Sequence, residues 1–262
     1  MKENVVGIIA GTGLYKSINA KNQKKVNVKT PFGNPSSPVF TGSLGKTKIA
    51  FISRHGLKHT INPSNVNYRA NIFALKKLGC TSIISVNAVG SLKKALKPGY
   101  LVFADQFIDR TYARKNTFYD KNKVCHINVS EPFCPSLREQ LISHAKKLEL
   151  NSSSKAVYVC IEGPRFSTKA ESALYRKWGA DIIGMTLCPE ASLAREAQIC
   201  YANISMITDY DNLKAGEEVT VEQIFSRIDS MTEKSVSLLE KTISMLGKKN
   251  CVCSKALEQA LI

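Results

Sequence analysis

The stretch that decides the fold class is Val5-Val6-Gly7-Ile8-Ile9-Ala10-Gly11-Thr12-Gly13. Its first six residues form a short, largely β-branched run, which is typical of a strand buried on both faces of a sheet. Two glycines follow directly, and they allow backbone N–H groups to approach an anion. The spacing does not match the dinucleotide fingerprint, because position 16 is Lys, and it does not match the Walker loop. The pattern therefore predicts a buried strand that ends in a turn able to bind a small anion.

The same alternation of apolar runs and capped helical segments continues along the chain. Further strands are predicted at 49–53, 82–86, 100–104, 156–161, 181–185 and 201–207. Helices are expected to begin where a Pro or a capping residue precedes a 3.6-residue apolar period, at Asn62-Pro63, Pro135, Thr168, Pro189 and Thr220. Residues 19–38, with several Lys, Asn and Pro, are predicted to form a loop. We therefore expect one α/β domain over residues 1–262, with helices flanking a largely buried mixed sheet.

The net charge of +16 invites a nucleic-acid interpretation. The first 180 residues carry a formal charge of +20 and the last 82 carry −4. No block of five or six consecutive cations occurs, and aromatic residues are not interleaved with the basic ones. The excess Lys is therefore interpreted as a solvated surface, compatible with a small-anion site. With no apolar run of about 18 residues and no secretory h-region, we expect a cytoplasmic protein with no nucleic-acid or membrane partner.

Eight cysteines are scattered along the sequence. Only Cys251 and Cys253 form a close pair, and a single C-x-C with no neighbouring His is a poor zinc site. Others, such as Cys80, Cys160 and Cys200, lie in apolar stretches, where a buried thiol behaves as a small hydrophobic group. The sequence therefore predicts no metal site.

Small and polar residues follow several predicted strands, at the ends where α/β sheets bind ligands. In Arg54-His55-Gly56, Arg offers a bidentate fork for phosphate and His can donate to a third oxygen. The segment Asn87-Ala88-Val89-Gly90-Ser91 is predicted to be a turn with room for a ligand, and Gly184-Met185-Thr186 ends another strand. Each motif alone is also compatible with an ordinary turn. Together they favour a phosphate site.

Carboxylates lie further along the chain. Glu162 stands at a strand end, and Arg165 is its expected ion-pair partner, because a buried carboxylate needs one. Asp209 and Asp211 are spaced by two, which places them on one side of an extended segment. They could bind a nitrogenous base or only cap a loop. The sequence has no G-x-S-x-G elbow, so a serine hydrolase is not supported. Taken together, the anion-binding motifs and the carboxylates favour a phosphate-using enzyme that holds a nitrogen heterocycle.

In order along the chain, these motifs resemble the purine nucleoside phosphorylase family, and within it the S-methyl-5'-thioadenosine phosphorylase branch. The resemblance rests on Gly11-Thr12-Gly13, Arg54-His55-Gly56, Asn62-Pro63, Val66-Asn67-Tyr68-Arg69-Ala70-Asn71, Asp105-Gln106-Phe107-Ile108-Asp109, Glu162-Gly163-Pro164-Arg165-Phe166, Met185-Thr186 and Thr208-Asp209-Tyr210-Asp211. It implies a phosphorylase fold with a distorted, barrel-like mixed sheet, in a homotrimer or a hexamer made of two trimers. It also implies that inorganic phosphate is a co-substrate and that no cofactor is needed.

The resemblance also implies roles for individual residues. Phosphate would be held by Thr12, Arg54, His55, Asn87, Ala88 and Thr186. The purine nucleoside would be held by Phe166 and Met185 at the sugar, Asp209 and Asp211 at the purine, Val221 and Ile224 at the 5′ substituent, and His126 from a neighbouring subunit. The catalytic residues would be Asp209 and His55.

Phosphorolysis of this kind makes the sugar positive and the leaving purine negative. Bound phosphate stabilises the first charge, and a protonated carboxyl at N7 relieves the second. Asp209 would therefore need a raised pKa, which a closed, dry pocket provides. The expected reaction is phosphorolysis of S-methyl-5'-thioadenosine, and of other purine nucleosides, in purine and methionine salvage.

One departure from the branch leaves the substrate open. Asn87 stands where these enzymes usually carry Thr, so a broad-specificity purine nucleoside phosphorylase or a methylthioinosine phosphorylase that prefers 6-oxopurines is the alternative. The Asp209 and Asp211 carboxylates still favour a 6-amino purine, since they accept hydrogen bonds from an amino group and repel a 6-oxo group.

Two other functional classes are alternatives to a phosphorylase. A nucleosidase would cleave the same substrate with water, and a nucleic-acid-binding module rests on net charge alone.

The resemblance to archaeal relatives implies disulfides within Cys251-Val252-Cys253 and between Cys134 and Cys200.

Overall fold

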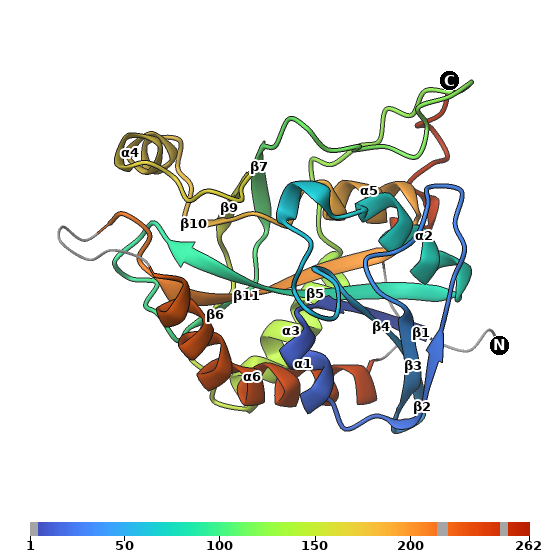
Figure 1. Cartoon of the computed structure of the whole chain (residues 1–262), viewed down its shortest axis with the longest axis horizontal. Coiled ribbons are helices and arrows are strands. Elements are labelled where there is room, and N and C mark those ends of the chain that lie inside the picture. The colour runs from blue at the N-terminus through green and yellow to red at the C-terminus, as the bar shows by residue number, and fades with distance from the viewer. Residues whose placement is uncertain (1–4, 214–219, 247–250) are drawn as a thin grey trace.

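The computed structural model describes residues 5–213, 220–246 and 251–262 and shows a central β-sheet with helices on both faces (Figure 1). The strands are β1 (Val5–Ala10), β2 (Lys21–Val26), β3 (Val39–Leu44), β4 (Thr47–Ser53), β5 (Cys80–Ser91), β6 (Leu101–Val102), β7 (Gln106–Arg110), β8 (Ser152–Ser153), β9 (Val157–Ile161), β10 (Ile182–Gly184) and β11 (Cys200–Asp209). The helices are α1 (Thr12–Ser17), α2 (Tyr68–Lys77), α3 (Pro135–Lys147), α4 (Lys169–Lys177), α5 (Glu190–Glu196) and α6 (Val221–Ser244), with 3-10 turns η1 (Pro63–Asn65) and η2 (Cys253–Lys255).

The sheet is mixed, and its long strand β5 joins its parts. The main path runs β2-β3-β4-β1-β5-β10-β9-β7, while β11 also pairs with β5 and leads on to β6 and β8. β5 is parallel to β1 and to β11, and its last two residues are antiparallel to β10. A strand of 12 residues is long enough to have different neighbours at its two ends. The predicted mixed α/β sheet flanked by helices is therefore confirmed.

Among the described residues, two large hydrophobic clusters and a smaller one fill the space between the sheet and its helices. On one face, α1, α3 and α6 supply Leu14, Leu141 and Leu239 to a core shared with β1 and β11. On the other face, α2 and α5 supply Ile72 and Leu193. The two layers of helices lie below and above the sheet in Figure 1, and α4 lies apart, over β9 and β10. Burial of apolar surface on both faces explains why the strands read as near-continuous apolar runs.

Helix boundaries follow the predicted capping signals at most positions. The Thr168 and Thr220 side chains accept hydrogen bonds from the N–H groups of Glu171 and Gln223, and both capping boxes are complete. The predicted start at Asn62-Pro63 is wrong for an α-helix, because only the short turn η1 forms there. The helix α2 begins at Tyr68 instead, where the side chain of Asn67 provides the cap.

The prediction of a loop over residues 19–38 is also wrong, because it contains β2. Five of the six β2 residues are exposed, and within the described part of the chain β2 pairs with β3 alone. An edge strand with exposed Lys side chains has no apolar pattern in its sequence. Hydrogen bonds to β3, and not burial of side chains, hold β2 in place. Nor does the sequence predict β3, β7 or the two-residue strand β8. The segment Asn87–Ser91, predicted to be a turn, is the end of β5, so its small residues lie within the sheet.

None of the helices that the structure describes combines the length and the apolarity needed to cross a lipid bilayer.

A substitution at Gly184 tests the packing of this sheet. A Cβ on Gly184 would overlap Tyr158 Oη, and Tyr158 is fully buried. We expect Gly184→Ala to reduce the free energy of unfolding by about 1–3 kcal/mol, because the ring must move within a closed core. Urea unfolding measures the change.

The matched control is Gly13→Ala in α1, where a Cβ meets nothing within 4 Å. Its free energy of unfolding should stay at or slightly above that of the wild type, because Ala favours a helix over Gly. Equal stability of both variants and the wild type would contradict the packing around Tyr158.

Candidate active site

The predicted site residues follow strands that meet at one edge of the sheet. β1, β4, β5 and β11 run parallel to one another, so the segments after Ala10, Ser53 and Asp209 emerge near the end of β5. β10 runs back along β5 from Ser91, and this direction brings Thr186 beside Asn87. The topology thus gathers the predicted anion-binding and acidic residues into one place.

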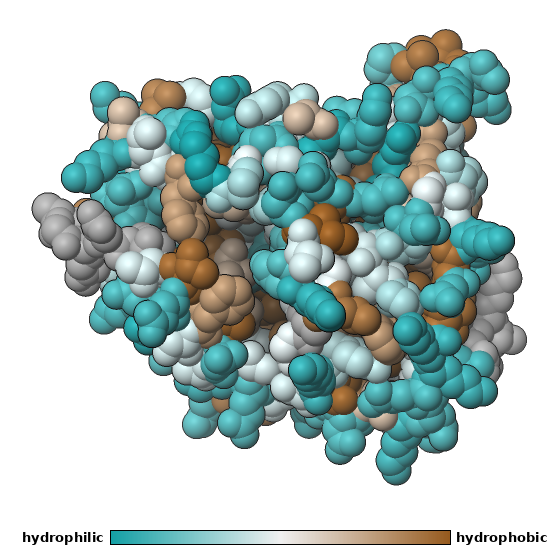
Figure 2. Space-filling model, viewed as in Figure 1, coloured by the Kyte–Doolittle hydropathy of each residue, from teal (hydrophilic) through white to brown (hydrophobic). Residues whose placement is uncertain are grey.

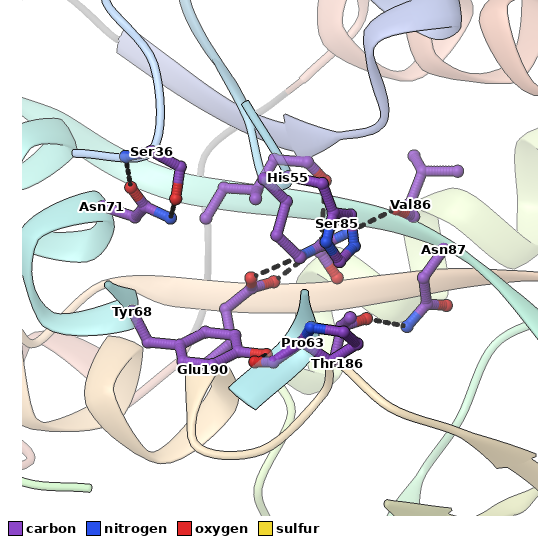
Figure 3. A network of polar contacts seen from close by, with 12 residues as sticks. Ser36, His55, Pro63, Tyr68, Asn71, Ser85, Val86, Asn87, Thr186 and Glu190 are labelled. Carbon is purple, nitrogen blue, oxygen red and sulfur yellow. Dashed lines mark hydrogen bonds and ion pairs between the residues drawn. The ribbon is translucent and has the colours of Figure 1, made fainter. Parts of the chain in front are cut away.

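Arg54 is fully buried, and its guanidinium fork is directed at a carboxylate of the protein. Nε and Nη2 donate to the two carboxylate oxygens of Glu190, at 2.8 and 3.0 Å. Nη2 also donates to Ile9 O, at 3.2 Å, and Nη1 donates to Val86 O, at 3.0 Å (Figure 3, with Val86 and Glu190 labelled). This differs from the predicted role, in which the fork faces phosphate. One Nη1 hydrogen has no acceptor among the described residues and is the donor that Arg54 can offer to an anion.

Glu190, the first residue of α5, is as deeply buried as Arg54. Its Oε1 also lies 2.8 Å from Tyr201 Oη. Burial of a charge pair is tolerated when the geometry is bidentate and other groups satisfy the remaining lone pairs. The negative Glu190 keeps the pKa of Arg54 above its usual value despite burial, so Arg54 stays charged.

His55 is neutral, and its protonated nitrogen faces away from the anion site. Nδ1 lies 2.9 Å from Ile61 O, and because a carbonyl only accepts, Nδ1 carries the hydrogen. Burial, and then the charge of Arg54, lower the pKa of His55 to about 4. The ring stacks on His59 at a centroid distance of 4.6 Å. At neutral pH the free Nε2 is therefore an acceptor, suited to the hydroxyl of hydrogen phosphate, and not the predicted donor.

Asn87 lies behind Thr186 and orients it. The Asn87 Nδ2 group donates to Tyr158 Oη and to Thr186 Oγ1, each at 3.1 Å, while Asn87 Oδ1 accepts from Asn203 and Ser205. Both Nδ2 hydrogens are thereby used within the protein. Thr186 Oγ1 accepts from Asn87, which leaves its own hydrogen to donate to an anion. Asn87 thus positions Thr186, the predicted phosphate ligand, and offers no amide hydrogen of its own.

The remaining predicted phosphate ligands are Ala88 and Thr12. Ala88 is a half-buried residue of β5, opposite Met206 of β11. The backbone of Thr12 opens α1, and its side chain lies outside the part of the structure that is described. The role of Thr12 as a phosphate ligand stays a prediction.

Asp209 ends β11, and its surroundings favour the protonated form of its carboxyl group. Its Oδ2 accepts from Thr208 Oγ1 and its Oδ1 from Asp211 N, both at 2.7 Å. Burial is the main cause of a raised pKa at Asp209, and the nearby Asp211 charge adds to it. A Cβ on Gly90 would lie 2.9 Å from Asp209 Oδ1, so Gly90 makes room for this carboxyl.

Asp211 adjoins Asp209, but its carboxyl group does not share a face with that of Asp209 as predicted. Its backbone is left-handed, with φ of +45°, so the two carboxyl groups are not on one face of an extended segment. The Asp211 carboxylate accepts hydrogen bonds from Ser167 Oγ, at 2.9 Å, and from Ser172 Oγ. Ser172 belongs to α4. Asp211 therefore anchors the segment after β11 to α4, and Asp209 is the carboxyl left to a ligand.

Glu162 has Arg114 as its partner, so the predicted pair with Arg165 is wrong. Arg114 Nε lies 3.3 Å from Glu162 Oε1, whereas exposed Arg165 pairs with Glu171 of α4. Arg114 also donates to Met185 O and Cys188 O, at 2.7 and 2.5 Å. It therefore joins the segments after β9 and β10 and positions Met185. A lone Arg in a long loop carries no sequence signal, and the prediction missed it.

The hydrophobic residues predicted to contact the sugar and the 5′ substituent are all partly or fully exposed. Phe166 is 44% exposed and Val221 57% exposed, while Met185 and Ile224 are half-buried. Phe225 of α6, which the prediction also missed, packs edge-on against the His59 ring, with 5.8 Å between the ring centroids. The start of α6 therefore lies over the His55–His59 pair. Figure 2 shows hydrophobic side chains around a hollow between the positions of α4 and α6 in Figure 1.

His126 is not part of this group within one chain. It is exposed, and its N–H donates to Ala260 O, at 2.8 Å, near the C-terminus. That end of the molecule is drawn at the upper right of Figure 1, away from the start of α6. A role in the site can come only from a neighbouring subunit.

Comparison with known proteins agrees with the fold. Residues 5–244 match the phosphorylase superfamily. S-methyl-5'-thioadenosine phosphorylase of Thermofilum pendens is 51% identical, with all of both chains covered, and that of Nitrosopumilus maritimus is 48% identical over 99% of this chain and 98% of its own. A crystal structure of methylthioadenosine phosphorylase from an antarctic soil metagenomic library superposes with a TM-score of 0.93, at 39% identity over 100% and 93% of the two chains.

The chain belongs to the phosphorylase superfamily. Among these relatives it is similar over its full length to S-methyl-5'-thioadenosine phosphorylases.

The buried ion pair can be tested by removing one charge. Glu190→Gln leaves the Arg54 charge without a counter-ion in the core, so we expect the free energy of unfolding to fall by about 3–5 kcal/mol. Urea unfolding measures it.

Glu171→Gln is the matched control, because Glu171 forms a solvent-exposed pair with Arg165. Solvent screens such a pair, and we expect little change in stability. A loss at Glu190→Gln no larger than that of the control would contradict the structural role of the buried pair.

Proposed function

We propose that this chain catalyses the phosphorolysis of S-methyl-5'-thioadenosine. An oxygen of phosphate bonds to C1′ of the nucleoside, the bond from C1′ to N9 breaks, and adenine and 5-methylthioribose 1-phosphate form. We further propose that the reaction belongs to purine and methionine salvage and takes place in the cytoplasm. The chain would form a homotrimer or a hexamer in which His126 contributes to the site of a neighbouring subunit.

The observation that carries the proposal is the placement of Asp209, a carboxyl with a raised pKa, at the same sheet edge as Arg54, His55 and Thr186. The full-length similarity to S-methyl-5'-thioadenosine phosphorylases supports the same substrate. One end of the site is suited to an anion and the other to a leaving base, as phosphorolysis requires.

At the anion end, the residues present an ordered set of donors and one acceptor. Thr186 Oγ–H and the remaining Arg54 Nη1–H donate to phosphate oxygens, and His55 Nε2 accepts from the phosphate hydroxyl. This arrangement leaves an unprotonated phosphate oxygen to attack C1′. The bound dianion also stabilises the positive charge that develops on the sugar.

At the base end, Asp209 acts on the leaving purine. Its protonated oxygen donates to N7, and its other oxygen accepts from the 6-amino group. Because Asp211 is engaged by Ser167 and Ser172, the preference for a 6-amino purine rests on Asp209. A 6-oxo purine presents an acceptor to an acceptor, which disfavours it.

Activity assays with and without phosphate test the proposal. Wild-type enzyme should convert S-methyl-5'-thioadenosine only when phosphate is present, and should prefer it and adenosine to methylthioinosine, inosine and guanosine. Turnover that persists without phosphate would establish a nucleosidase. A preference for the 6-oxo nucleosides would establish the alternative phosphorylase.

Asp209→Asn tests the acid. An amide cannot transfer a proton, so kcat/KM should fall by about 10²–10⁴-fold. Because the acid form is required and the pKa of Asp209 is raised, wild-type activity should decline as pH rises through that pKa, and the variant should lack this decline. Asp229→Asn, on the exposed side of α6, is the control and should retain wild-type kinetics. Wild-type turnover by Asp209→Asn would exclude the acid role.

A further inference from the structure

Four cysteines from three parts of the chain meet at one point outside the active site. Cys134 caps the start of α3, Cys200 begins β11, and Cys251 and Cys253 belong to the C-terminal segment. Their four sulfur atoms all lie within 4.8 Å of one another, and all four thiols are free, which differs from the two predicted disulfides. Cys134, Cys200 and Cys253 are buried, and Cys251 is half-buried. The second ligand pair that the sequence around Cys251 lacks is thus supplied by the fold.

The spacing of the sulfur atoms fits a tetrahedral metal site. Zn²⁺ bound by four thiolates has Zn–S bonds of about 2.3 Å, which places the sulfur atoms about 3.8 Å apart. The Cys200 and Cys251 sulfur atoms lie 3.4 Å apart, and none of the other pairs exceeds 4.8 Å. Shifts of less than about 1 Å in half-buried and buried side chains would complete the tetrahedron.

The surroundings suit a closed, negatively charged site. Cys134, Cys200 and Cys253 belong to the hydrophobic cluster that contains Leu137 and Met206, so little water reaches the sulfur atoms. Zn²⁺ with four thiolates carries a net charge of −2. Arg195 Nη1 lies 3.4 Å from Cys253 Sγ and donates to it, which offsets part of that charge. Donation of this kind to a coordinating group is typical of metal sites.

The arginine is itself held in place. Arg195 Nη2 donates to Glu131 O at 2.6 Å, and Nε donates to Asn128 O at 3.4 Å. The guanidinium therefore has a fixed position next to the cluster, independent of any metal ion.

We propose that Cys134, Cys200, Cys251 and Cys253 bind one Zn²⁺ ion as a structural site. Each thiol that is protonated releases its proton when its sulfur binds the ion, and neither the metal nor the sulfur changes oxidation state. Four protein ligands leave no open position for substrate, so the ion has no catalytic task.

The site would fix the C-terminal segment to the body of the protein. Beyond the cysteines, Gln198 Nε2 donates to Ser254 O at 2.5 Å, and the segment pairs with the loop around Cys125, where Cys125 and Leu261 form a β-bridge. Since Cys251 and Cys253 connect this segment to α3 and β11, loss of the ion should loosen residues 251–262.

Metal analysis of the full-length protein, purified with Zn²⁺ and without reductant or chelator, tests the site. We expect about one zinc per chain in the wild type and less than about one tenth of that in Cys251→Ser and Cys253→Ser. Cys80→Ala, at a buried cysteine in β5 outside the cluster, should retain the full zinc content. Limited proteolysis should cleave residues 251–262 faster after zinc is removed.

A second measurement uses the wild type alone, in case a serine variant does not fold. Co²⁺ added to the metal-free wild-type protein should give the absorption of a tetrahedral tetrathiolate centre, and Zn²⁺ should displace it. After denaturation in chelator, mass spectrometry should find all eight thiols free. Disulfides among these four cysteines, the absence of zinc from the wild type, or equal zinc in wild type and serine variants would each overturn the proposal.

Discussion

The buried ion pair between Arg54 and Glu190 is the interaction on which the rest of the site depends. It joins the end of β4 to the start of α5, and the same guanidinium holds the carbonyl groups of Ile9 in β1 and Val86 in β5. Neither charge is tolerable in this core without the other. The pair therefore fixes the relative positions of three strands and a helix, and it leaves a single Arg54 N–H for an anion.

The electrostatics of the site follow from what surrounds each group. Arg54 stays charged because Glu190 faces it, His55 stays neutral because burial and Arg54 disfavour a second cation, and the Asp209 carboxyl gains affinity for its proton by burial. The anion end and the acid end thus differ in charge although both are enclosed. The net charge of +16 contributes little to this arrangement, which depends on a few buried groups.

The sequence predicted the elements whose signal is local. Apolar runs located β1 and β11, and capping boxes located α4 and α6, because those patterns arise from burial and from helix ends. β2 was missed because an exposed edge strand carries no apolar pattern. The partners of Arg54, Asp211 and Glu162 could not be predicted, since Glu190, Ser172 and Arg114 are distant in sequence and only the fold brings them into contact.

The most direct test of this account is the KM for phosphate of the double variant Arg54→Met/Glu190→Leu. Replacing both charges with apolar groups of similar size should leave the protein folded, because such replacements are often neutral or stabilising. If Arg54 also contacts the anion, the KM for phosphate should rise by about 10-fold or more, as expected for loss of a hydrogen bond from a charged group. A folded double variant with the wild-type KM for phosphate would contradict the account, because the pair would then serve only the fold.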